Sequence, residues 1–386
     1  MKNRKVCVFI NTRGNYGKLY STMLAIQASK NLELQLVVGG ALLDSNYGDH
    51  RNIILRNGFQ INALLEYPST GETLTRTAIA AGICTSQAGR ILSKLKPDFV
   101  LIIADRYESL SIAHAAVCLN FCIVHLEGGE VSGSIDERIR HCISKLAHYH
   151  LVANTGAASR VAKMGEHEDN IFVTGSPSFD LLDQINYPSQ SESISRQFTE
   201  LQLSFDTNIS DDYLVISFHP VVTEYDKVSN HVGQLVEAIK SLHIPSLWVV
   251  PNDDSGALVI REYLRKVINN TFDSKIEIIG SLETKAYALL LKHSLCLVGN
   301  SSSGIREAAF LGVPAVNIGS RQNGRQRGIN VIDVAASVEE IRSAVKTQIK
   351  HGSYEPDTLY GDGKSGPKIV QILASISPIV EKLISY

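Results

Sequence analysis

A run of small, hydroxylated residues at 299–307, Gly-Asn-Ser-Ser-Ser-Gly-Ile-Arg-Glu, follows an apolar segment that is typical of a buried parallel strand. We expect the chain to pass there from a strand into a helix, Ile305 to Leu311, so that several backbone N–H groups point at one place. The partial positive charge at the start of that helix adds to these donors and favours a phosphate group. Glu307, one turn into the helix, can accept a hydrogen bond from a sugar hydroxyl. These residue types therefore predict a phosphorylated ligand that carries a sugar.

Three acidic residues in the first half of the chain lie at the ends of expected strands. Asp105 and Glu127 each come just after a buried apolar strand, and Asp136 opens a helix. Each has an ordinary alternative, since Asp105 can pair with its neighbour Arg106, and Asp136 can merely favour the helix dipole. Because adjacent parallel strands end at one edge of a sheet, we expect the three carboxylates to converge on one cleft. Carboxylates that lie close together push their pKa values apart, which separates an acid from a base.

Basic residues follow other strand ends. Arg13 lies in a Gly-bearing turn after the first strand, where it can clasp a pyrophosphate or serve as an ordinary surface arginine. That turn is not a G-x-G-x-x-G fingerprint, so neither a nicotinamide nor a flavin cofactor is expected. His219 follows a strand of the second half and is either structural or turned toward the same cleft. The loop 319–328 carries three arginines, which suit a diphosphate unless the loop is simply solvated, and Asp253-Asp254 indicates a turn and not a metal site.

The elements that position these residues belong to a chain of 386 residues, of which 44% are apolar and 20% charged. This length allows two domains, each with its own core. A formal net charge of −2 gives no footprint for nucleic acid and no polybasic surface for a membrane. No apolar run reaches the roughly 20 residues of a membrane span, and the basic start of the chain does not resemble a signal peptide. The six cysteines form no CxxC pair, which is typical of reduced thiols in the cytoplasm.

Apolar strands alternate with helices along the whole chain, from the strand Lys5–Asn11 onward. Strands that are buried on both faces imply an α/β fold of two doubly wound, Rossmann-like domains that face each other across a cleft. We expect the final helix, Lys368 to Ser385, to pack back on the first domain. The expected parts are an N-terminal domain with the carboxylates, a linker, a C-terminal domain with the serine loop and the C-terminal helix, with bounds 1–176, 177–212, 213–365 and 366–386.

Several motifs follow one another in a fixed order. The most specific is the block His125–His148, which begins His-Leu-Glu-Gly-Gly-Glu-Val-Ser-Gly-Ser-Ile-Asp-Glu-Arg. It is followed by Phe218–Thr223, Gly299–Glu307, Gly319–Gln322 and Tyr360–Gly363. Together these motifs resemble the hydrolysing UDP-N-acetylglucosamine 2-epimerases of sialic acid synthesis over nearly the whole chain. Non-hydrolysing relatives carry Glu-Ala-Gly where this chain has Glu-Gly-Gly.

The resemblance implies a glycosyltransferase-B-like fold in which UDP is held mainly by the second domain, without a metal or other cofactor. It implies a homodimer or homotetramer, and it places the essential carboxylates at Asp105, Glu127 and Asp136. Gly14-Asn15 departs from the family, whose members usually carry an acid there. The positions that match ligand-binding residues of the family are Arg13, Arg106, His219, Asn252, Leu282, Ser301, Ser302, Glu307 and Arg321.

The implied reaction converts UDP-N-acetylglucosamine and water to N-acetylmannosamine and UDP through a 2-acetamidoglucal. The three carboxylates would carry the protons, and His219 would serve the phosphate or the first proton transfer. Alternatives are the same reaction on UDP-2,4-diacetamido-2,4,6-trideoxyglucose, as in legionaminic acid synthesis, a glycosyltransferase, and a nucleotide-sugar-binding protein without turnover. Three converging acids argue against the last, because binding alone gives no reason to place them together.

Overall fold

The computed structural model describes residues 3–44, 49–68, 74–103, 105–132, 136–187, 212–250, 257–269, 275–280 and 282–385. The chain divides into two compact units. Unit 1 comprises Met1–Glu130, Asp136–Gln184 and Tyr360–Tyr386, and unit 2 comprises Val131–Ile135 and Ile185–Leu359. The chain thus leaves unit 1 after Gln184 and returns to it at Tyr360.

Unit 1 is built around a seven-stranded sheet in the order β3-β2-β1-β4-β5-β6-β7, and every neighbouring pair is parallel. Its strands are β1 (Arg4–Ile10), β2 (Leu32–Gly39), β3 (Ile61–Leu65), β4 (Phe99–Ile103), β5 (Cys122–Leu126), β6 (Tyr149–Val152) and β7 (Ile171–Val173). Its helices are α1 (Arg13–Ala28), α2 (His50–Arg56), α3 (Leu74–Leu95), α4 (Tyr107–Cys118), α5 (Asp136–Leu146), α6 (Thr155–Lys163), α7 (Ser178–Gln184) and α14 (Ser365–Ser375). This arrangement confirms the parallel α/β class that the alternating strands predicted.

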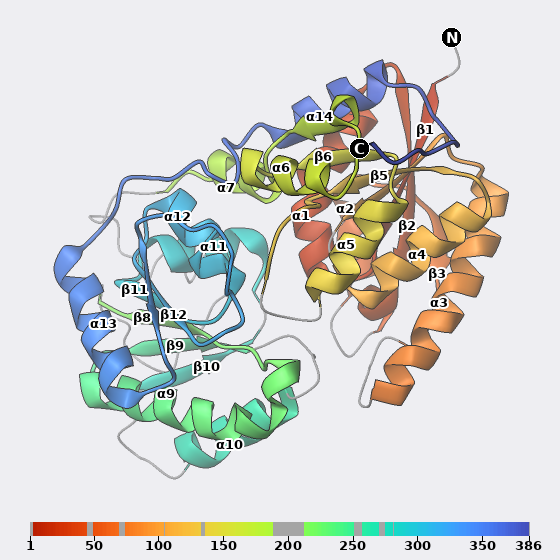
Figure 1. The fold of residues 1–386 in the computed structure, drawn as a ribbon. Helices are drawn as coiled ribbons and strands as arrows, with labels where there is room; N and C mark the ends of the chain where they lie inside the picture. The colour runs from red at the N-terminus through yellow and green to blue at the C-terminus, as the bar shows by residue number, and fades with distance from the viewer. Residues whose placement is uncertain are drawn as a thin grey trace. The chain divides into compact units, whose positions relative to one another are not determined.

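The central strands of unit 1 are buried on both faces, which explains their unbroken apolar runs. In β1, Val6, Val8 and Ile10 pack into one core, while Cys7 and Phe9 pack into another. Side chains of α1 and α14 belong to the first core, and those of α3 and α4 belong to the second. Figure 1 shows these helices beside the strands of unit 1. The strand order reverses between β1 and β4, and the carboxyl ends of strands beside such a reversal are where α/β sheets bind ligands.

The C-terminal helix is shorter than predicted. Helix α14 ends at Ser375, and residues 376–385 contain no helix, so the expected extension to Ser385 is wrong. The Arg4 guanidinium donates to three carbonyls at the helix end at 2.5–3.2 Å, which satisfies groups that a longer helix would use. Pro378 also disfavours helical backbone at the residue before it. The rest of the tail stays in unit 1, where Lys382 Nζ donates to three carbonyls at the end of α5.

Unit 2 is built around a six-stranded parallel sheet in the order β10-β9-β8-β11-β12-β13. Its strands are β8 (Leu214–Ser217), β9 (Ser246–Val249), β10 (Ile276–Ile279), β11 (Cys296–Gly299), β12 (Ala315–Ile318) and β13 (Val331–Val334). Its helices are α9 (Val228–Leu242), α10 (Ala257–Asn269), α11 (Thr284–Lys292), α12 (Glu307–Leu311) and α13 (Val338–His351). One core contains residues of α9, α10 and α13, and the opposite core contains residues of α11 and α12. Unit 2 is therefore a second doubly wound sheet, as predicted.

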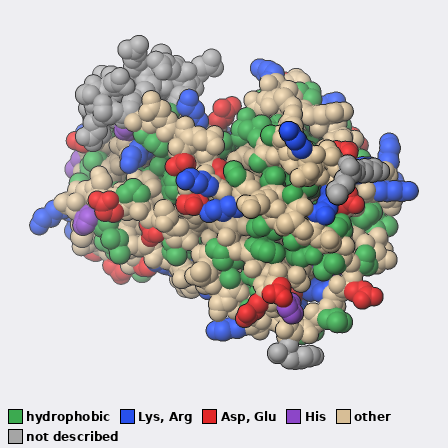
Figure 2. Space-filling view, turned by 90° about the horizontal axis from the view of Figure 1, so that it is seen from above, with side chains coloured by type: hydrophobic (Ala, Val, Ile, Leu, Met, Phe, Trp, Pro, Cys, Tyr) green, Lys and Arg blue, Asp and Glu red, His purple; other side chains and the backbone are tan. Residues whose placement is uncertain are grey.

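Within the stretches described above, no helix is long and apolar enough to cross a membrane. Figure 2 shows Lys, Arg, Asp and Glu side chains mixed over the face that it presents, in keeping with the net charge of −2. Mixed charges of this kind do not create the single-sign field that attracts a polyanion.

Candidate active site

Glu127 lies just after β5, where the chain turns through Gly128 and Gly129. Its φ of +60° is in the left-handed region, and the residue is buried. A Cβ at Gly128 would lie 2.9 Å from both His125 Nδ1 and Ser144 Oγ, which are themselves hydrogen-bonded at 3.1 Å. Gly129 has a φ of +74°, and a Cβ there would lie 2.4 Å from a backbone carbonyl oxygen. The two glycines thus let the turn pack closely on α5 and α6, and that packing fixes Glu127.

Two donors hold the Glu127 carboxylate. Lys18 Nζ, on α1, lies 3.1 Å from Oε2, and the hydroxyl of Ser176, after β7, donates to Oε1. Ser176 is fully buried, whereas Lys18 is 31% exposed. Sequence reasoning missed both residues because they lie 109 and 49 positions from Glu127 and no motif marks them. Their place in the chain could have indicated them, because Lys18 comes after β1 and Ser176 after β7, and both strands end at the same edge of the sheet as β5.

Arg140 of α5 links the other two acids. Its Nη2 donates to Asp105, after β4, and its Nη1 donates to the carbonyl of Glu130 at 2.7 Å. Burial opposes the charge of Arg140, but the nearby Asp105, Glu130 and Asp136 favour it, and the net effect raises the pKa of the guanidinium. Arg140 thus joins Asp105, after β4, to the turn that begins at Glu127, after β5, and Asp136 lies near enough to favour its charge. Sequence reasoning gave Arg140 no role.

Arg13 and Arg106 lie at the starts of the helices that follow β1 and β4. Arg106 precedes α4, and its Nε donates to the buried carboxylate of Glu108 at 2.8 Å. Arg13 is the first residue of α1 and is exposed. Asn15, at the place where the resembled family usually has an acid, is buried and accepts a hydrogen bond from the Thr12 hydroxyl at 3.1 Å. Both arginines therefore lie at the carboxyl edge of the unit 1 sheet.

In unit 2 the serine loop follows β11, and the expected helix ends at Leu311 as predicted but begins two residues later than Ile305. The chain first forms a 3-10 turn at Ser302–Gly304, and α12 begins only at Glu307. Ser301 Oγ accepts hydrogen bonds from the N–H and the hydroxyl of Ser303, at 3.3 and 2.9 Å. Such side-chain bonds to the local backbone compete with α-helical hydrogen bonds. Most N–H groups of the loop are used within the protein, and fewer point at one place than predicted.

Two groups in this loop keep unused hydrogen-bonding capacity. The N–H of Ser302 has no acceptor among the residues that the structure describes. Glu307 Oε2 is buried and, within the same described residues, has no donor. Buried polar atoms are nearly always hydrogen-bonded, so an unsatisfied carboxylate oxygen indicates a missing partner. A donor for a phosphate oxygen and an acceptor for a hydroxyl are thus both present in one short segment.

Asn300 ties three strand ends of unit 2 together. Its Oδ1 accepts from the His219 N–H at 2.7 Å, and its Nδ2 donates to the His219 carbonyl at 2.8 Å. Its backbone carbonyl accepts from Arg321 Nη1 at 3.1 Å and from Gln322 Nε2 at 2.9 Å. His219, the serine loop and Arg321, at the ends of β8, β11 and β12, therefore form one connected group. Sequence reasoning missed Asn300, although it lies inside the serine motif.

The arginine loop is held largely by its own side chains. Arg325 Nη1 donates to Gln322 Oε1 at 3.0 Å, and Arg327 Nη2 donates to the Gln322 carbonyl at 2.5 Å. Arg327 also pairs with Asp333 of β13. Two of the three arginines therefore stabilise the loop itself, which leaves Arg321 as the arginine of this loop best placed for a diphosphate.

Two further predicted contacts concern the region before the serine loop. Asn252 lies outside the described residues, as does the Asp253-Asp254 turn. Leu282, just before α11, is partly buried against the core that α11 and α12 cover. In the described part of the chain, no three His, Cys, Asp or Glu side chains are grouped so that they could hold a metal ion.

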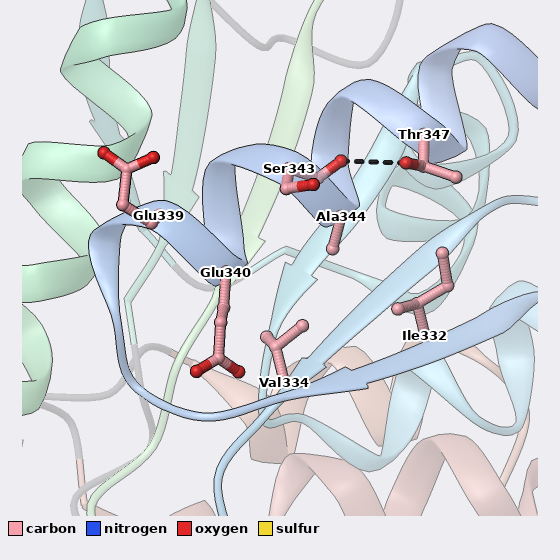
Figure 3. A pocket seen from close by; sticks show the side chains of 7 residues that line it. All are labelled: Ile332, Val334, Glu339, Glu340, Ser343, Ala344 and Thr347. Atoms are coloured by element: carbon pink, nitrogen blue, oxygen red, sulfur yellow. Dashed lines mark hydrogen bonds between the residues drawn. The ribbon is translucent and has the colours of Figure 1, made fainter.

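An open groove of about 490 Å³ lies between β13 and α13 of unit 2 (Figure 3). Its lining consists of Ile332, Val334, Glu339, Glu340, Ser343, Ala344 and Thr347. Two carboxylates and no basic side chain face it, so the groove does not suit a phosphate. The group around Asn300, which includes Arg321, suits a phosphate better than this groove does.

A comparison with protein families decides what kind of protein carries these features. Residues 24–374 match the family model described as UDP-N-acetylglucosamine 2-epimerase. The chain belongs to this family. It is thus an enzyme of the UDP-N-acetylglucosamine 2-epimerase family, which confirms the resemblance that the His125–His148 block and the later motifs indicated.

Relatives of this epimerase family member differ in the sugar that they are named for. The hydrolysing UDP-N,N'-diacetylbacillosamine 2-epimerase of Legionella pneumophila is 33% identical over 99% of this chain and 100% of that protein. The UDP-N-acetylglucosamine 2-epimerase of Neisseria meningitidis serogroup B is 31% identical over 93% of this chain and 91% of that protein.

A solved UDP-N-acetylglucosamine 2-epimerase shares the fold of this epimerase family member. The structure of the Neisseria meningitidis enzyme bound to UDP-N-acetylglucosamine has a TM-score of 0.78 at 17% identity, over 96% of this chain and 99% of that chain. At that identity the likeness establishes the two-sheet α/β architecture and no more.

Proposed function

We propose that this family member is a hydrolysing enzyme that converts UDP-N-acetylglucosamine and water to N-acetylmannosamine and UDP, as the first step of sialic acid synthesis. The observation that carries the proposal is the acidic edge of unit 1, defined as Asp105, Glu127 and Asp136. Lys18 and Ser176 hold Glu127, and the charge of Arg140 is favoured by both aspartates. Acids that are held in this way, at the carboxyl ends of parallel strands, suit proton transfer better than they suit simple binding.

The first step is an elimination that opens the sugar–phosphate bond. A carboxylate of the acidic edge takes the proton from C2, the electron pair forms the C1–C2 double bond, and the anomeric C–O bond breaks to release UDP. The products of this step are UDP and 2-acetamidoglucal. The leaving diphosphate gains negative charge, and Arg13, Arg321 and the Ser302 N–H would stabilise it electrostatically.

The second step adds water to the glycal. One carboxylate takes a proton from a water molecule while the water oxygen bonds to C1. Another acidic group delivers a proton to C2, on the face that gives the manno configuration. This step needs a base and an acid at once, which is why more than one carboxyl group is required. Arg140 and Lys18 favour the ionised forms of Asp105 and Glu127, respectively, because an opposite charge nearby favours a charged carboxylate.

Unit 2 would hold the nucleotide. The unsatisfied Glu307 Oε2 would accept a hydrogen bond from a ribose hydroxyl, while the Ser302 N–H and Arg321 would donate to the phosphates. His219, whose backbone Asn300 fixes on both sides, would also serve the phosphate or the first proton transfer. Ser301, Leu282, Asn252 and Arg106 stay assigned to ligand binding as predictions from the family motifs.

The same reaction on UDP-2,4-diacetamido-2,4,6-trideoxyglucose, that is, UDP-N,N'-diacetylbacillosamine, is the second candidate. The 33% identity with the Legionella pneumophila enzyme, over 99% of this chain, favours it. The chemistry at C1 and C2 is identical for both sugars, so the acidic edge and the nucleotide contacts would serve either of them. The two candidates differ only in the groups at C4 and C6.

Product analysis tests both candidates. The purified protein is incubated separately with each UDP-sugar in D₂O, without any acceptor, and the products are followed by NMR. We expect free 2-acetamido sugar with inverted C2 and deuterium at C2 from the native substrate. A requirement for an acceptor would instead indicate a glycosyltransferase, and recovery of unchanged UDP-sugar would indicate a binding protein.

Two variants test the acidic edge itself. Glu127→Gln and Asp136→Asn keep the size of each side chain but remove its proton-transfer capacity, and each should lower kcat about 10²- to 10⁴-fold. The affinity for UDP should stay within about twofold, because the proposed nucleotide contacts lie elsewhere in the chain. Near-normal turnover in both variants would remove the carboxylates from the mechanism.

A further inference from the structure

The proposed mechanism gives Ser176 one task, to hold Glu127, and gives the segments around it none. Ser176 follows β7 by three residues, is fully buried, and donates its hydroxyl hydrogen to Glu127 Oε1. Its Oγ also lies 3.1 Å from the hydroxyl and 3.4 Å from the N–H of Ser178. A serine hydroxyl has a single proton, and a charged acceptor takes it in preference to a neutral one, so the proton goes to Glu127 while Ser178 donates back.

The Tyr360–Gly363 segment, a motif that had no assigned role, supports Ser176. The carbonyl of Tyr360 accepts a hydrogen bond from the Ser176 N–H at 2.7 Å. A Cβ at Gly361 would lie 3.0 Å from the Ser176 nitrogen and 3.4 Å from the Gly175 Cα. A Cβ at Gly175 would in turn lie 3.0 Å from the Gly361 Cα. The two segments therefore lie backbone against backbone because neither has a side chain at the contact.

Both glycines also have backbone angles that other residues avoid. The φ of Gly361 is +145° and that of Gly175 is +80°. Steric room and backbone angle thus require glycine at both positions for independent reasons. The chain leaves unit 1 after Gln184 and re-enters it at Tyr360, so this close contact lies just inside the two points where the chain crosses between the units.

We propose that Ser176, seated on the Tyr360–Gly363 segment, is a positioning residue for Glu127. A buried hydroxyl, fixed through its own backbone, holds Oε1 and restricts the rotation of the carboxylate. Oε2 is the oxygen on the side of the partly exposed Lys18. Oε2 is then the oxygen that exchanges a proton with the sugar. This inference rests on the proposed role of Glu127 and adds the element that orients it.

The first experiment compares Ser176→Ala with Ser246→Ala under saturating substrate. Ser246 is also fully buried, but its hydroxyl bonds to the Ile244 carbonyl at the start of β9 in unit 2. We expect Ser176→Ala to lower kcat about 10- to 100-fold, the size of a lost hydrogen bond to a charged group, with KM and the UDP affinity nearly unchanged. Ser246→Ala should leave kcat within about twofold.

The pH profile separates positioning from a loss of packing. A donor to the ionised carboxylate favours the ionised form, so its removal should move the limb of the kcat profile that Glu127 governs to higher pH by about one unit. Ser176→Thr, which keeps the hydroxyl, should restore the position of that limb. A Ser176→Ala enzyme with unchanged kcat and an unchanged profile would overturn the proposal.

The second experiment changes the Tyr360–Gly363 segment, which supports Ser176, and leaves the serine itself in place. Gly361→Ala should lower kcat as Ser176→Ala does, and the double variant should be little worse than either single one, because both act on the same hydrogen bond. Gly58→Ala is the matched control, since Gly58 also has a positive φ, +84°, but has no atom within 4 Å of a Cβ there. If the losses in kcat of Ser176→Ala and Gly361→Ala added in the double variant, the Tyr360–Gly363 segment would not act through Ser176.

Parallel measurements on Glu127→Gln keep the two proposals distinguishable. If Glu127→Gln turns over normally, the proposed catalytic role of Glu127 fails, and the positioning role fails with it. If Glu127→Gln is inactive while Ser176→Ala and Gly361→Ala are both fully active, only the positioning role fails. If Ser176→Ala does not fold, the Gly361→Ala result and its control decide between these outcomes.

Discussion

The acidic edge of unit 1 and the serine loop of unit 2 differ in how much hydrogen-bonding capacity the protein itself uses. Lys18, Ser176 and Arg140 hold two carboxylates of the acidic edge, Glu127 and Asp105. The Ser302 N–H and Glu307 Oε2 of the serine loop have no partner among the described residues. Groups that transfer protons need a fixed orientation before the substrate arrives. Groups that bind a nucleotide need capacity that only the ligand satisfies. The difference supports the proposal that the acidic edge does the chemistry and the serine loop binds the nucleotide.

Loss of Arg140 should break the acidic edge most severely. Arg140→Met removes a buried cation that Asp105 and the Glu130 carbonyl both bind, and it leaves the carboxylates to repel one another. We expect kcat to fall at least about 100-fold and the free energy of unfolding to fall by about 3 kcal/mol. Turnover by NMR and urea unfolding measure the two effects. Arg140→Lys keeps the charge but not both contacts, so it should lie between the wild type and Arg140→Met; equal loss in both variants would contradict the charge argument.

Loss of Glu307 should have the opposite signature. Since Glu307 Oε2 has no partner among the described residues, Glu307→Ala should weaken UDP binding about 10- to 100-fold with almost no loss of folding stability. Calorimetric titration with UDP and a thermal melt without ligand measure the two quantities. Tyr287→Phe is the matched control. The Tyr287 hydroxyl lies 2.7 Å from Ser303 Oγ, and its loss should lower the folding stability because this contact lies within the protein. A large loss of folding stability in Glu307→Ala would contradict the view that its carboxylate is left for a ligand.

Local sequence patterns predicted the sheets well and the long-range partners poorly. The apolar runs of β4 and β5 show burial on both faces directly, and the strand ends then locate Asp105 and Glu127. Lys18, Ser176 and Arg140 reach those acids from three other elements, and no local spacing records such contacts. The helix after the serine loop starts two residues later than predicted because a serine hydroxyl accepts from the nearby backbone. The helix to Ser385 was wrong because Arg4 donates to the carbonyls at the end of α14.

A buried carboxylate in unit 1, Glu166, should make the folding stability depend on pH. Glu166 is buried, accepts hydrogen bonds from His150 and Lys145 at 3.0 and 2.6 Å, and forms an ion pair with Lys382 at 2.7 Å. Burial raises the pKa of its carboxyl group, but the three donors outweigh burial and lower the pKa from 4.5 to about 2. Burial also lowers the pKa of His150 and of Lys382. Glu166 thus stabilises the fold above about pH 4.5, and this contribution is lost as the pH falls toward 2.

Protonation of His150 acts in the same direction at higher pH. Because its pKa is lowered in the folded state, the unfolded chain binds the proton more readily, and stability should begin to fall as the pH drops below about 6.5. We expect Glu166→Gln to be less stable than the wild type by on the order of 2 kcal/mol at pH 7, with the difference shrinking toward pH 3. Urea unfolding at several pH values checks this. Asp362→Asn, which removes the exposed pair with Lys368, should change stability by less than about 1 kcal/mol.

The smallest expected effect concerns the arginine loop, and it tests whether charge alone attracts the diphosphate. Arg327 donates to the Gln322 carbonyl and pairs with Asp333, so its charge is already compensated, whereas Arg321 donates to the Asn300 carbonyl beside the serine loop. Arg321→Ala should therefore weaken UDP binding at least about tenfold, and Arg327→Ala by less than about twofold. Titrations at two salt concentrations measure both. If the two variants lost affinity equally, a general positive field would explain binding, and the assignment of separate roles to the loop arginines would be wrong. Unequal losses would show that connection to the Asn300 group, and not the number of nearby arginines, selects the residue that meets the phosphate.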